Sequence, residues 1–497
     1  MRDMDIMKNI KEMSFENKAF CLFLCVHLLV WSMIGLIRTV LPTDALEGIY
    51  WGSLHDFGTP KHPPFAGWVT YWIYSIFKTD YSVYFVSQAF IVGGFYYIYK
   101  LGRIFLNEKS AILSVILLEG CWVYSYITGY YGFNPDVILL FLLPLLTYVF
   151  YKCMTEDKKI NWVNLGLITG ICFLNKYQTA LILIPMFIWA LMFKKEVFKN
   201  KMFYISVIIA FLIFLPHLLW MINYDFFPLM YFEGELGSNS WFNHIKAPFM
   251  LLFMQICAVA GTLLIYGLLK FKQKSALKLS QSITKEKTWL LLLFYFFPLI
   301  FTMLMVGFGG ATRFRWGFEF LYLTPIMLFY FFPANDISKD DFKFVLKFAY
   351  SVMLIVFLSL GTLLAVEKNY RSRYPVSQIY SDMNKIWANE YKTPLKYFGG
   401  YIEWTLPLTV YGKDHQQIIL DTNGYKNPWI DEQDLKKSGI MIIGRDEEHI
   451  FDDTKKSCPY LDESYVIIPM PYSFKVKNAF GQERQYDIFY HIVPPIN

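Results

Sequence analysis

The chain has 497 residues, of which 55% are hydrophobic and 20% aromatic, whereas only 17% carry a charge. Because soluble domains carry roughly 25% charged residues, this composition excludes one large soluble core and indicates a polytopic membrane protein. The formal net charge of +6 is therefore no evidence for nucleic-acid binding, and the seven cysteines are scattered without the spacing of a disulfide framework or a metal site.

Apolar segments that suit membrane-spanning helices recur over the first three quarters of the chain. Residues 19–37 form the first, with about the 20 residues that a crossing needs. No small-x-small cleavage site follows it, which favours a retained helix over a removed signal peptide. Further spans are expected near residues 81–99, 110–127, 136–151, 162–174, 177–193, 202–222, 247–269, 288–306, 318–334 and 346–366. The sequence thus predicts a mainly α-helical transmembrane bundle of about eleven spans.

The distribution of basic residues predicts the orientation of this bundle. When the N-terminus is placed in the cytoplasm, Lys and Arg are much more frequent in the inner segments than in the outer loops, as the positive-inside bias requires. The first outer loop, residues 38–80, and the C-terminal tail then lie on the extracytoplasmic side. Within that loop, residues 64–77 are too short to span the membrane and rich in Trp and Tyr, which suits a helix lying in the interface.

The first outer loop gathers several polar side chains between two apolar segments. Asp44 and Glu47 are spaced so that one helical turn would present both carboxylates on one face. Either can act as a general base if it reaches the proton that it removes, although a solvated loop acid is the simpler interpretation of each. Lys61 and His62 precede two prolines that stiffen the backbone. A fixed cation there suits a phosphate, and anchoring to lipid head groups is the alternative.

Four further charged residues are expected on the same outer side. Asp136 follows an Asn-Pro step before an apolar segment, where plain helix capping is the alternative to a binding role. Lys176, Arg313 and Arg315 are cations on the side that the positive-inside bias depletes. Cations at membrane depth usually pair with another group, while snorkelling to the interface would explain any one of them.

The composition changes after residue 366, where mixed-charge sequence without a candidate span begins. Ile379, Met383, Ile386 and Trp387 mark one face of a helix. Short β-type runs follow at residues 417–420, 439–443, 465–468 and 487–492, and Asp431 is placed to cap a helix that ends at Gly439. The sequence therefore predicts a transmembrane domain, residues 1–367, and a small extracytoplasmic α/β domain, residues 368–497.

These motifs resemble those of the GT-C superfamily of glycosyltransferases, in the bacterial group that includes protein O-mannosyltransferases and the lipid A aminoarabinose transferase. The most specific match is D-x-x-E-x-x-x-WG…G…KHPP-x-x-x-W, formed here by Asp44, Glu47, Trp51, Gly52, Gly58, Lys61, His62, Pro63, Pro64 and Trp68. Weaker matches follow in order: FNPD at residues 133–136, the Gly-rich GLITGICFLNKYQTALIL at 166–183, PHLLW at 216–220 and RFRWG at 313–317. Many relatives carry adjacent acids in the first motif, whereas two residues separate Asp44 from Glu47 here. Which of the two is the base stays open, with Asp44 favoured.

The resemblance implies a membrane glycosyltransferase of the bacterial inner membrane that uses a sugar on a polyprenyl phosphate. Asp44 or Glu47 would deprotonate an acceptor hydroxyl, which displaces the lipid phosphate in a single inverting step. Donor phosphate or sugar contacts would come from Lys61, His62, Asp136, Lys176, Arg313 and Arg315. The acceptor would be lipid A, another glycan, a glycolipid or a protein, and neither a metal nor another cofactor is required. A polytopic transporter or flippase is the main alternative, although the repeated halves typical of transporters are not evident in the sequence.

Overall fold

The computed structural model describes residues 13–156, 158–237, 240–311, 315–420, 427 and 429–496. Contacts within the chain divide it into two compact units. Unit 1 comprises residues 1–34, 83–219 and 235–360, and unit 2 comprises residues 35–82, 220–234 and 361–497. The predicted domains, residues 1–367 and 368–497, group the first outer loop with the spans instead. The division into these two domains stays a prediction.

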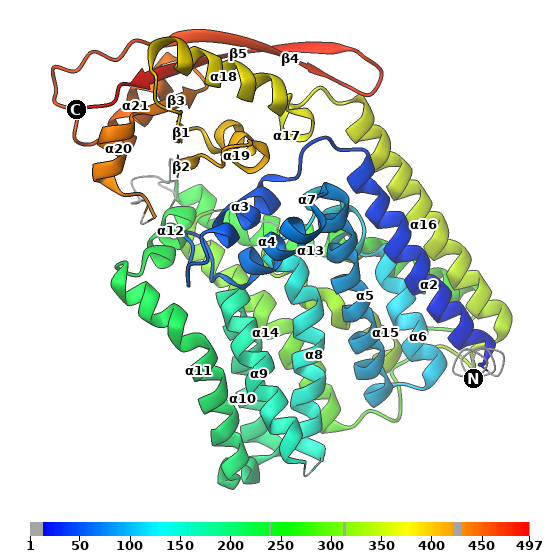
Figure 1. The fold of residues 1–497 in the computed structure, drawn as a ribbon. Helices are drawn as coiled ribbons and strands as arrows, with labels where there is room; N and C mark the ends of the chain where they lie inside the picture. The colour runs from blue at the N-terminus through cyan, green and yellow to red at the C-terminus, as the bar shows by residue number, and fades with distance from the viewer. Residues whose placement is uncertain are drawn as a thin grey trace, which may run out of the picture. The chain divides into compact units, whose positions relative to one another are not determined.

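Unit 1 consists of apolar helices, of which α8, α9, α10 and α14 pack side by side (Figure 1). Three of its helices, α5, α11 and α16, continue across the division into unit 2. The helices are α2 (Phe15–Ser32), α5 (Asp80–Phe105), α6 (Glu108–Ile116), α7 (Tyr126–Tyr131), α8 (Pro135–Thr155), α9 (Lys159–Asn175), α10 (Ala180–Phe193), α11 (Lys201–Asn223), α13 (Trp241–Lys272), α14 (Lys285–Gly309), α15 (Thr324–Phe331) and α16 (Lys339–Val366). Short 3-10 turns join them, including η2 (Leu117–Gly120), η4 (Tyr177–Thr179), η5 (Lys195–Lys199) and η6 (Phe318–Leu323).

All eleven segments that were expected to span the membrane are largely helical, and they differ in length and in hydropathy. Among the described residues, 6 helices are long and apolar enough to cross a membrane, namely α2, α8, α11, α13, α14 and α16, or up to 7 if a bent pair counts as one span. The segments Tyr177–Phe193 and Phe318–Phe331 are apolar but shorter. The structure therefore confirms a mainly helical membrane protein, while the count of about eleven spans and the orientation stay predictions.

The bent pair replaces the straight span expected near residues 110–127. The helical stretches Glu108–Gly120 and Trp122–Tyr131 meet at 77°, because the backbone of Cys121 between them is extended. Beside the bend, the backbone of Gly120 lies against that of Gly261. A Cβ at Gly120 would lie 2.5 Å from the Gly261 carbonyl carbon. Next to the bend, the fully buried Glu119 accepts a hydrogen bond from the Trp31 indole (3.0 Å) and pairs with His27 Nδ1 at 2.7 Å. This buried polar link ties the bend to α2.

Unit 2 is built around a five-stranded sheet of order β2-β1-β3-β5-β4, in which β1, β2 and β3 are parallel and β5 is antiparallel to both β3 and β4. Its strands are β1 (Tyr397–Gly400), β2 (Gln417–Leu420), β3 (Ile440–Gly444), β4 (Met470–Lys477) and β5 (Glu483–Val493). Its helices are α3 (Thr43–Ser53), α4 (Phe65–Phe77), most of α12 (Phe227–Leu236), α17 (Tyr370–Arg373), α18 (Val376–Glu390), α19 (Ile402–Tyr411), α20 (Glu432–Ser438) and α21 (Glu447–Ser457).

Most of the elements predicted in the tail are confirmed. Helix α18 buries Ile379, Met383 and Trp387, strands β2, β3 and β5 cover three of the expected runs, and the Asp431 carboxylate caps α20 by accepting hydrogen bonds from two backbone N–H groups. The strand expected at residues 465–468 is wrong, because that run pairs with no neighbour and the strand begins at Met470. Strand β1 was not predicted.

Three tyrosine hydrogen bonds explain why the first outer loop belongs to the same unit as the tail. The Tyr50 hydroxyl of α3 accepts a hydrogen bond from the Ile418 N–H of β2 (3.0 Å). The Tyr411 hydroxyl of α19 donates to the Asp80 carboxylate (2.8 Å) and accepts from the Leu41 N–H (3.0 Å). Hydrogen bonds of these tyrosine side chains thus link the first outer loop to the tail.

Helices α3 and α4 lie unusually close together, and glycine makes this approach possible. A Cβ at Gly52 would lie 2.2 Å from the Gly67 carbonyl oxygen, a separation that no side chain tolerates. Helix α4 also confirms the helix expected over residues 64–77, whereas its place in the membrane interface stays a prediction. The close helix pair holds the first motif in a compact, rigid arrangement.

Candidate active site

In unit 2, a buried ion pair joins the two parts of the first motif. Glu47, on α3, is only 3% exposed, and its Oε1 lies 2.5 Å from Lys61 Nζ. The ammonium group also lies 5.8 Å from the ring centroid of Trp51 and 5.6 Å from that of Tyr231. Aromatic faces within about 6 Å attract a cation. The Lys61 side chain, 22% exposed, is therefore held between one carboxylate and two aromatic rings.

A tight turn at residues 59–62 holds Lys61 beside the Glu47 carboxylate and the two aromatic rings. The Thr59 hydroxyl donates to the His62 carbonyl (2.7 Å) and accepts from the His62 N–H (2.9 Å), so the turn is closed on itself. Gly58 precedes the turn, and a Cβ there would lie 2.1 Å from the Trp220 ring. The His62 side chain is half-buried. The prolines that follow lead directly into α4, so the turn has little freedom to move.

Burial and mutual attraction shift the protonation of this pair. Burial raises the pKa of Glu47, and the neighbouring Lys61 ammonium opposes that shift only in part, while the Asp44 and Glu403 carboxylates add to it. Burial by itself would lower the pKa of Lys61, but the Glu47 carboxylate outweighs it and the pKa of Lys61 is raised. Lys61 is consequently a permanent cation at neutral pH.

Asp44 occupies a different environment on the same helix. It lies in the first turn of α3, one turn before Glu47, and it is half-buried. Negative charge is stabilised at the N-terminal end of a helix. Asp44 acts electrostatically on both Glu47 and Lys61, so the structure brings these three predicted residues together. Because the Glu47 carboxylate is bound to Lys61 and the Asp44 carboxylate lies one turn away, Asp44 and Glu47 can have separate roles.

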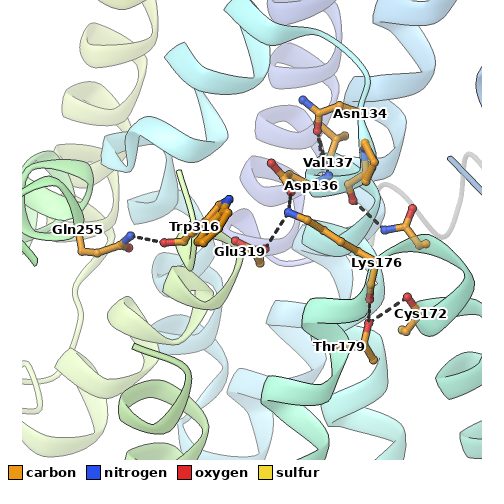
Figure 2. Close-up of polar contacts among 11 residues, drawn as sticks. Asn134, Asp136, Val137, Cys172, Lys176, Thr179, Gln255, Trp316 and Glu319 are labelled. Atoms are coloured by element: carbon orange, nitrogen blue, oxygen red, sulfur yellow. Dashed lines mark hydrogen bonds and ion pairs between the residues drawn. The ribbon is translucent and has the colours of Figure 1, made fainter. Parts of the chain in front are cut away.

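A second charged cluster lies in unit 1, where Lys176 points toward two carboxylates (Figure 2). Its Nζ forms an ion pair with Asp136 and lies 3.6 Å from Glu319 Oε1. The Asn134 side chain caps α8 by accepting hydrogen bonds from the N–H groups of Asp136 (2.9 Å) and Val137 (3.2 Å). The capping function expected near Asp136 thus belongs to Asn134, which leaves the Asp136 carboxylate to Lys176.

Arg315 completes this cluster, while Arg313 lies outside the described residues. The guanidinium carbon of Arg315 lies 4.2 Å from the ring centroid of Tyr131. Arg315, Asp136 and Glu319 also line a cavity of about 20 Å³, which has room for about one water molecule. Arg315 and the two carboxylates therefore line a space too small for a sugar, and Lys176 forms an ion pair with one of these carboxylates, Asp136.

Glu319 is the member of this cluster that the sequence analysis missed. It is 1% exposed and lies in η6, two residues after the RFRWG segment. An acid within an apolar stretch is rare and usually paired or functional. That rule applied to residues 318–334 would have identified it from the sequence.

Unit 1 also contains an apolar cavity of about 410 Å³ between α8, α9, α10 and α11. Ligand sites typically have volumes of about 300–1,000 Å³ and apolar linings. Trp162, Phe173, Leu183 and Phe214 are among its lining residues, and Phe173 lies three residues before Lys176. None of the predicted site residues that the structure describes lines this cavity. Among the described residues, no group of three or more His, Cys, Asp or Glu side chains is placed to hold a metal ion.

Both a family and a curated protein match part of this chain. Residues 61–220 match the family described as dolichyl-phosphate-mannose-protein mannosyltransferase. A segment of 194 residues is 25% identical to the lipopolysaccharide core galacturonosyltransferase RgtA of Rhizobium johnstonii, which covers 37% of this chain and 38% of that relative. The chain thus matches well under two thirds of the length of this relative.

The fold as a whole is shared with a solved structure. ArnT from Cupriavidus metallidurans bound to undecaprenyl phosphate superimposes with a TM-score of 0.60 and 12% identity over 95% of this chain and 97% of that one. The apo state of the same protein gives a TM-score of 0.59 at 12% identity, over 96% of this chain and 98% of that one. In the segment of the family match, in the segment shared with the curated relative and in its fold, the chain is thus similar to GT-C membrane glycosyltransferases.

Proposed function

We propose that the chain transfers a sugar from a polyprenyl-phosphate donor to an extracytoplasmic acceptor by a single inverting displacement. The observation that carries this proposal is the buried Glu47–Lys61 pair with Asp44 one turn away, which sets a fixed cation beside a second carboxylate. The names of the matched proteins support the choice of donor, since one family acts with dolichyl phosphate mannose and one solved relative binds undecaprenyl phosphate.

In this mechanism Asp44 is the base, and Glu47 holds Lys61 in place. The acceptor oxygen loses its proton to Asp44 and forms a bond to the anomeric carbon. The bond from that carbon to the phosphate oxygen breaks, and its electron pair stays on the phosphate. Lys61 donates hydrogen bonds to this departing oxygen. One preorganised donor of this kind stabilises a transition state by roughly 3–4 kcal/mol.

The remaining predicted residues are proposed as donor contacts on the ground of their chemistry. His62 can form a hydrogen bond to the phosphate or the sugar of the donor. Arg313 can form a charge contact with the phosphate. Lys176 already forms an ion pair with Asp136 in unit 1, and Arg315 lines the same small cavity as Asp136, so we expect these side chains to rearrange when a polar ligand binds. The 410 Å³ apolar cavity suits a hydrocarbon chain, such as the prenyl chain of the donor.

We further propose that the protein lies in the bacterial inner membrane. It would have about eleven spans, a cytoplasmic N-terminus and a periplasmic tail. The basic-residue asymmetry of the loops supports this orientation. A lipid, a glycan or a protein that carries a hydroxyl or a phosphate is the proposed acceptor class.

Binding of undecaprenyl phosphate to the purified chain in lipid nanodiscs tests the role of Lys61. We expect Lys61→Ala to weaken binding about tenfold or more, since a charge-assisted hydrogen bond contributes about 1.5–3 kcal/mol. Lys413→Ala, which removes an exposed lysine from the same unit, is the matched control and should bind like the wild type. Unchanged affinity in a correctly folded Lys61→Ala protein would show that Lys61 only anchors the loop to lipid head groups.

A further inference from the structure

The hairpin between β4 and β5 ends in a turn that exposes one large apolar side chain. Asn478 closes the turn, because its N–H donates to the Gln482 carbonyl (3.0 Å) and its side-chain oxygen accepts from the Phe480 and Gln482 N–H groups (3.0 and 2.9 Å). Gly481 follows with φ of 77°, a conformation that favours glycine. The Phe480 side chain at the tip is 71% exposed. The turn is thus well defined by hydrogen bonds, and its conformation keeps the Phe480 ring exposed.

The same turn is hydrogen-bonded to the end of a membrane-spanning helix. The Ala479 N–H donates to the Ala365 carbonyl (2.9 Å), and the Asn478 side-chain amide donates to the Val366 carbonyl (3.0 Å). Both carbonyls belong to the last turn of α16, which is one of the candidate spans. Such terminal carbonyls have no partner within their own helix. Figure 1 shows the hairpin reaching the end of α16, so its tip lies beside the end of this candidate span.

Basic side chains flank the exposed ring. Lys475 and Lys477 lie on β4, 59% and 65% exposed, and share the Glu483 carboxylate at 2.8 and 3.0 Å. Arg484 lies on β5, with its guanidinium carbon 4.9 Å from the Tyr486 ring centroid. Two lysines thus share one carboxylate near the tip, and Arg484 lies opposite Val476, on the other face of the hairpin. An apolar aromatic with neighbouring Lys and Arg is the composition of an interfacial membrane anchor.

We propose that this hairpin tip is a membrane-surface anchor, in which Phe480 inserts its ring among the lipid head groups of the leaflet where α16 ends. Lys477 and Arg484 then face the lipid phosphates beside it. The anchor ties the sheet of unit 2 to the bilayer at a point separate from the first outer loop. This inference depends on the membrane location of α16 and is independent of sugar transfer.

Site-specific photo-crosslinking tests the proposal on the full chain. The photoreactive residue benzoylphenylalanine replaces Phe480, the protein is placed in nanodiscs of phosphatidylethanolamine and phosphatidylglycerol, and adducts are identified by mass spectrometry after irradiation. This residue enlarges an already exposed ring, so the fold is preserved. The same replacement at Val466, which is equally exposed at 71% and lies before the opposite end of β4, is the matched control.

We expect phospholipid adducts at position 480 with a yield about tenfold above that at position 466. Equal yields at the two positions, or no lipid adduct at position 480, would overturn the proposal. An adduct of position 480 with another protein in native membranes, without lipid adducts, would also overturn it and assign the tip to a protein partner.

Discussion

Removing the Glu47 carboxylate while leaving Lys61 in place is expected to destabilise unit 2 strongly. The side chains are 4% and 22% exposed, and their charged atoms lie 2.5 Å apart. An uncompensated buried charge of this kind costs about 3–5 kcal/mol, which we expect for Glu47→Ala. For Glu47→Gln we expect about 1–2 kcal/mol, because a neutral hydrogen bond replaces a charge-assisted one. Glu463→Ala, at an exposed loop position, should change stability by less than about 0.5 kcal/mol.

A double-mutant cycle measures this coupling directly. Reversible denaturant unfolding of the purified protein in detergent, followed by tryptophan fluorescence, gives the free energy of unfolding of each variant. The pair Glu47→Leu and Lys61→Met should regain most of the stability lost in Glu47→Ala, because an apolar pair can replace a buried ion pair without penalty. Strictly additive losses in the two single variants and the double variant would refute the reasoning, since they would show that the two side chains do not interact.

Three further outcomes follow from the described contacts. The kcat/KM for transfer should fall as pH drops through the raised pKa of Glu47, because protonation breaks its ion pair, and a pH profile of Glu47→Gln should lack that limb. Gly52→Ala should lower both thermal stability and activity, since its Cβ would meet the Gly67 carbonyl, whereas Gly267→Ala, which meets nothing within 4 Å, should be neutral or stabilising by about 0.5–1 kcal/mol. Glu119→Ala should lower the free energy of unfolding by about 3–5 kcal/mol, and an unchanged melting temperature would contradict the buried link to α2.

Several local features could be predicted because each depends on a short stretch of sequence. The apolar period of α18 placed Ile379, Met383 and Trp387 on its buried face, and Asp431 was identified as a helix cap from its position alone. Glu47 and Lys61 were selected from their motif, and their role as site residues stays a prediction. Their direct contact could not be predicted, because it depends on the turn at Thr59–His62 and on the close approach of α3 to α4.

Features that depend on a distant partner were missed or wrongly predicted. The run at residues 465–468 has a strand-like composition, but a strand also needs a neighbour, and the antiparallel partner of β5 starts only at Met470. Strand β1 is a short run with two glycines, and it forms because β2 and β3 flank it. The position of Glu319 within an apolar stretch was a local signal that was overlooked, whereas its pairing with Lys176, more than a hundred residues earlier in the chain, depends on a distant partner.

Mass spectrometry of the cell envelope tests the central proposal, sugar transfer with Asp44 as base, most directly. A strain that lacks this protein is compared with the same strain that expresses the wild-type chain or Asp44→Asn at equal levels. We expect one envelope component to lose a hexose, pentose or amino-sugar increment in the deletion strain, and we expect the wild-type chain to restore it while Asp44→Asn does not. Full restoration by Asp44→Asn would contradict the assignment of the base, and an envelope unchanged by the deletion would contradict the proposed transfer itself.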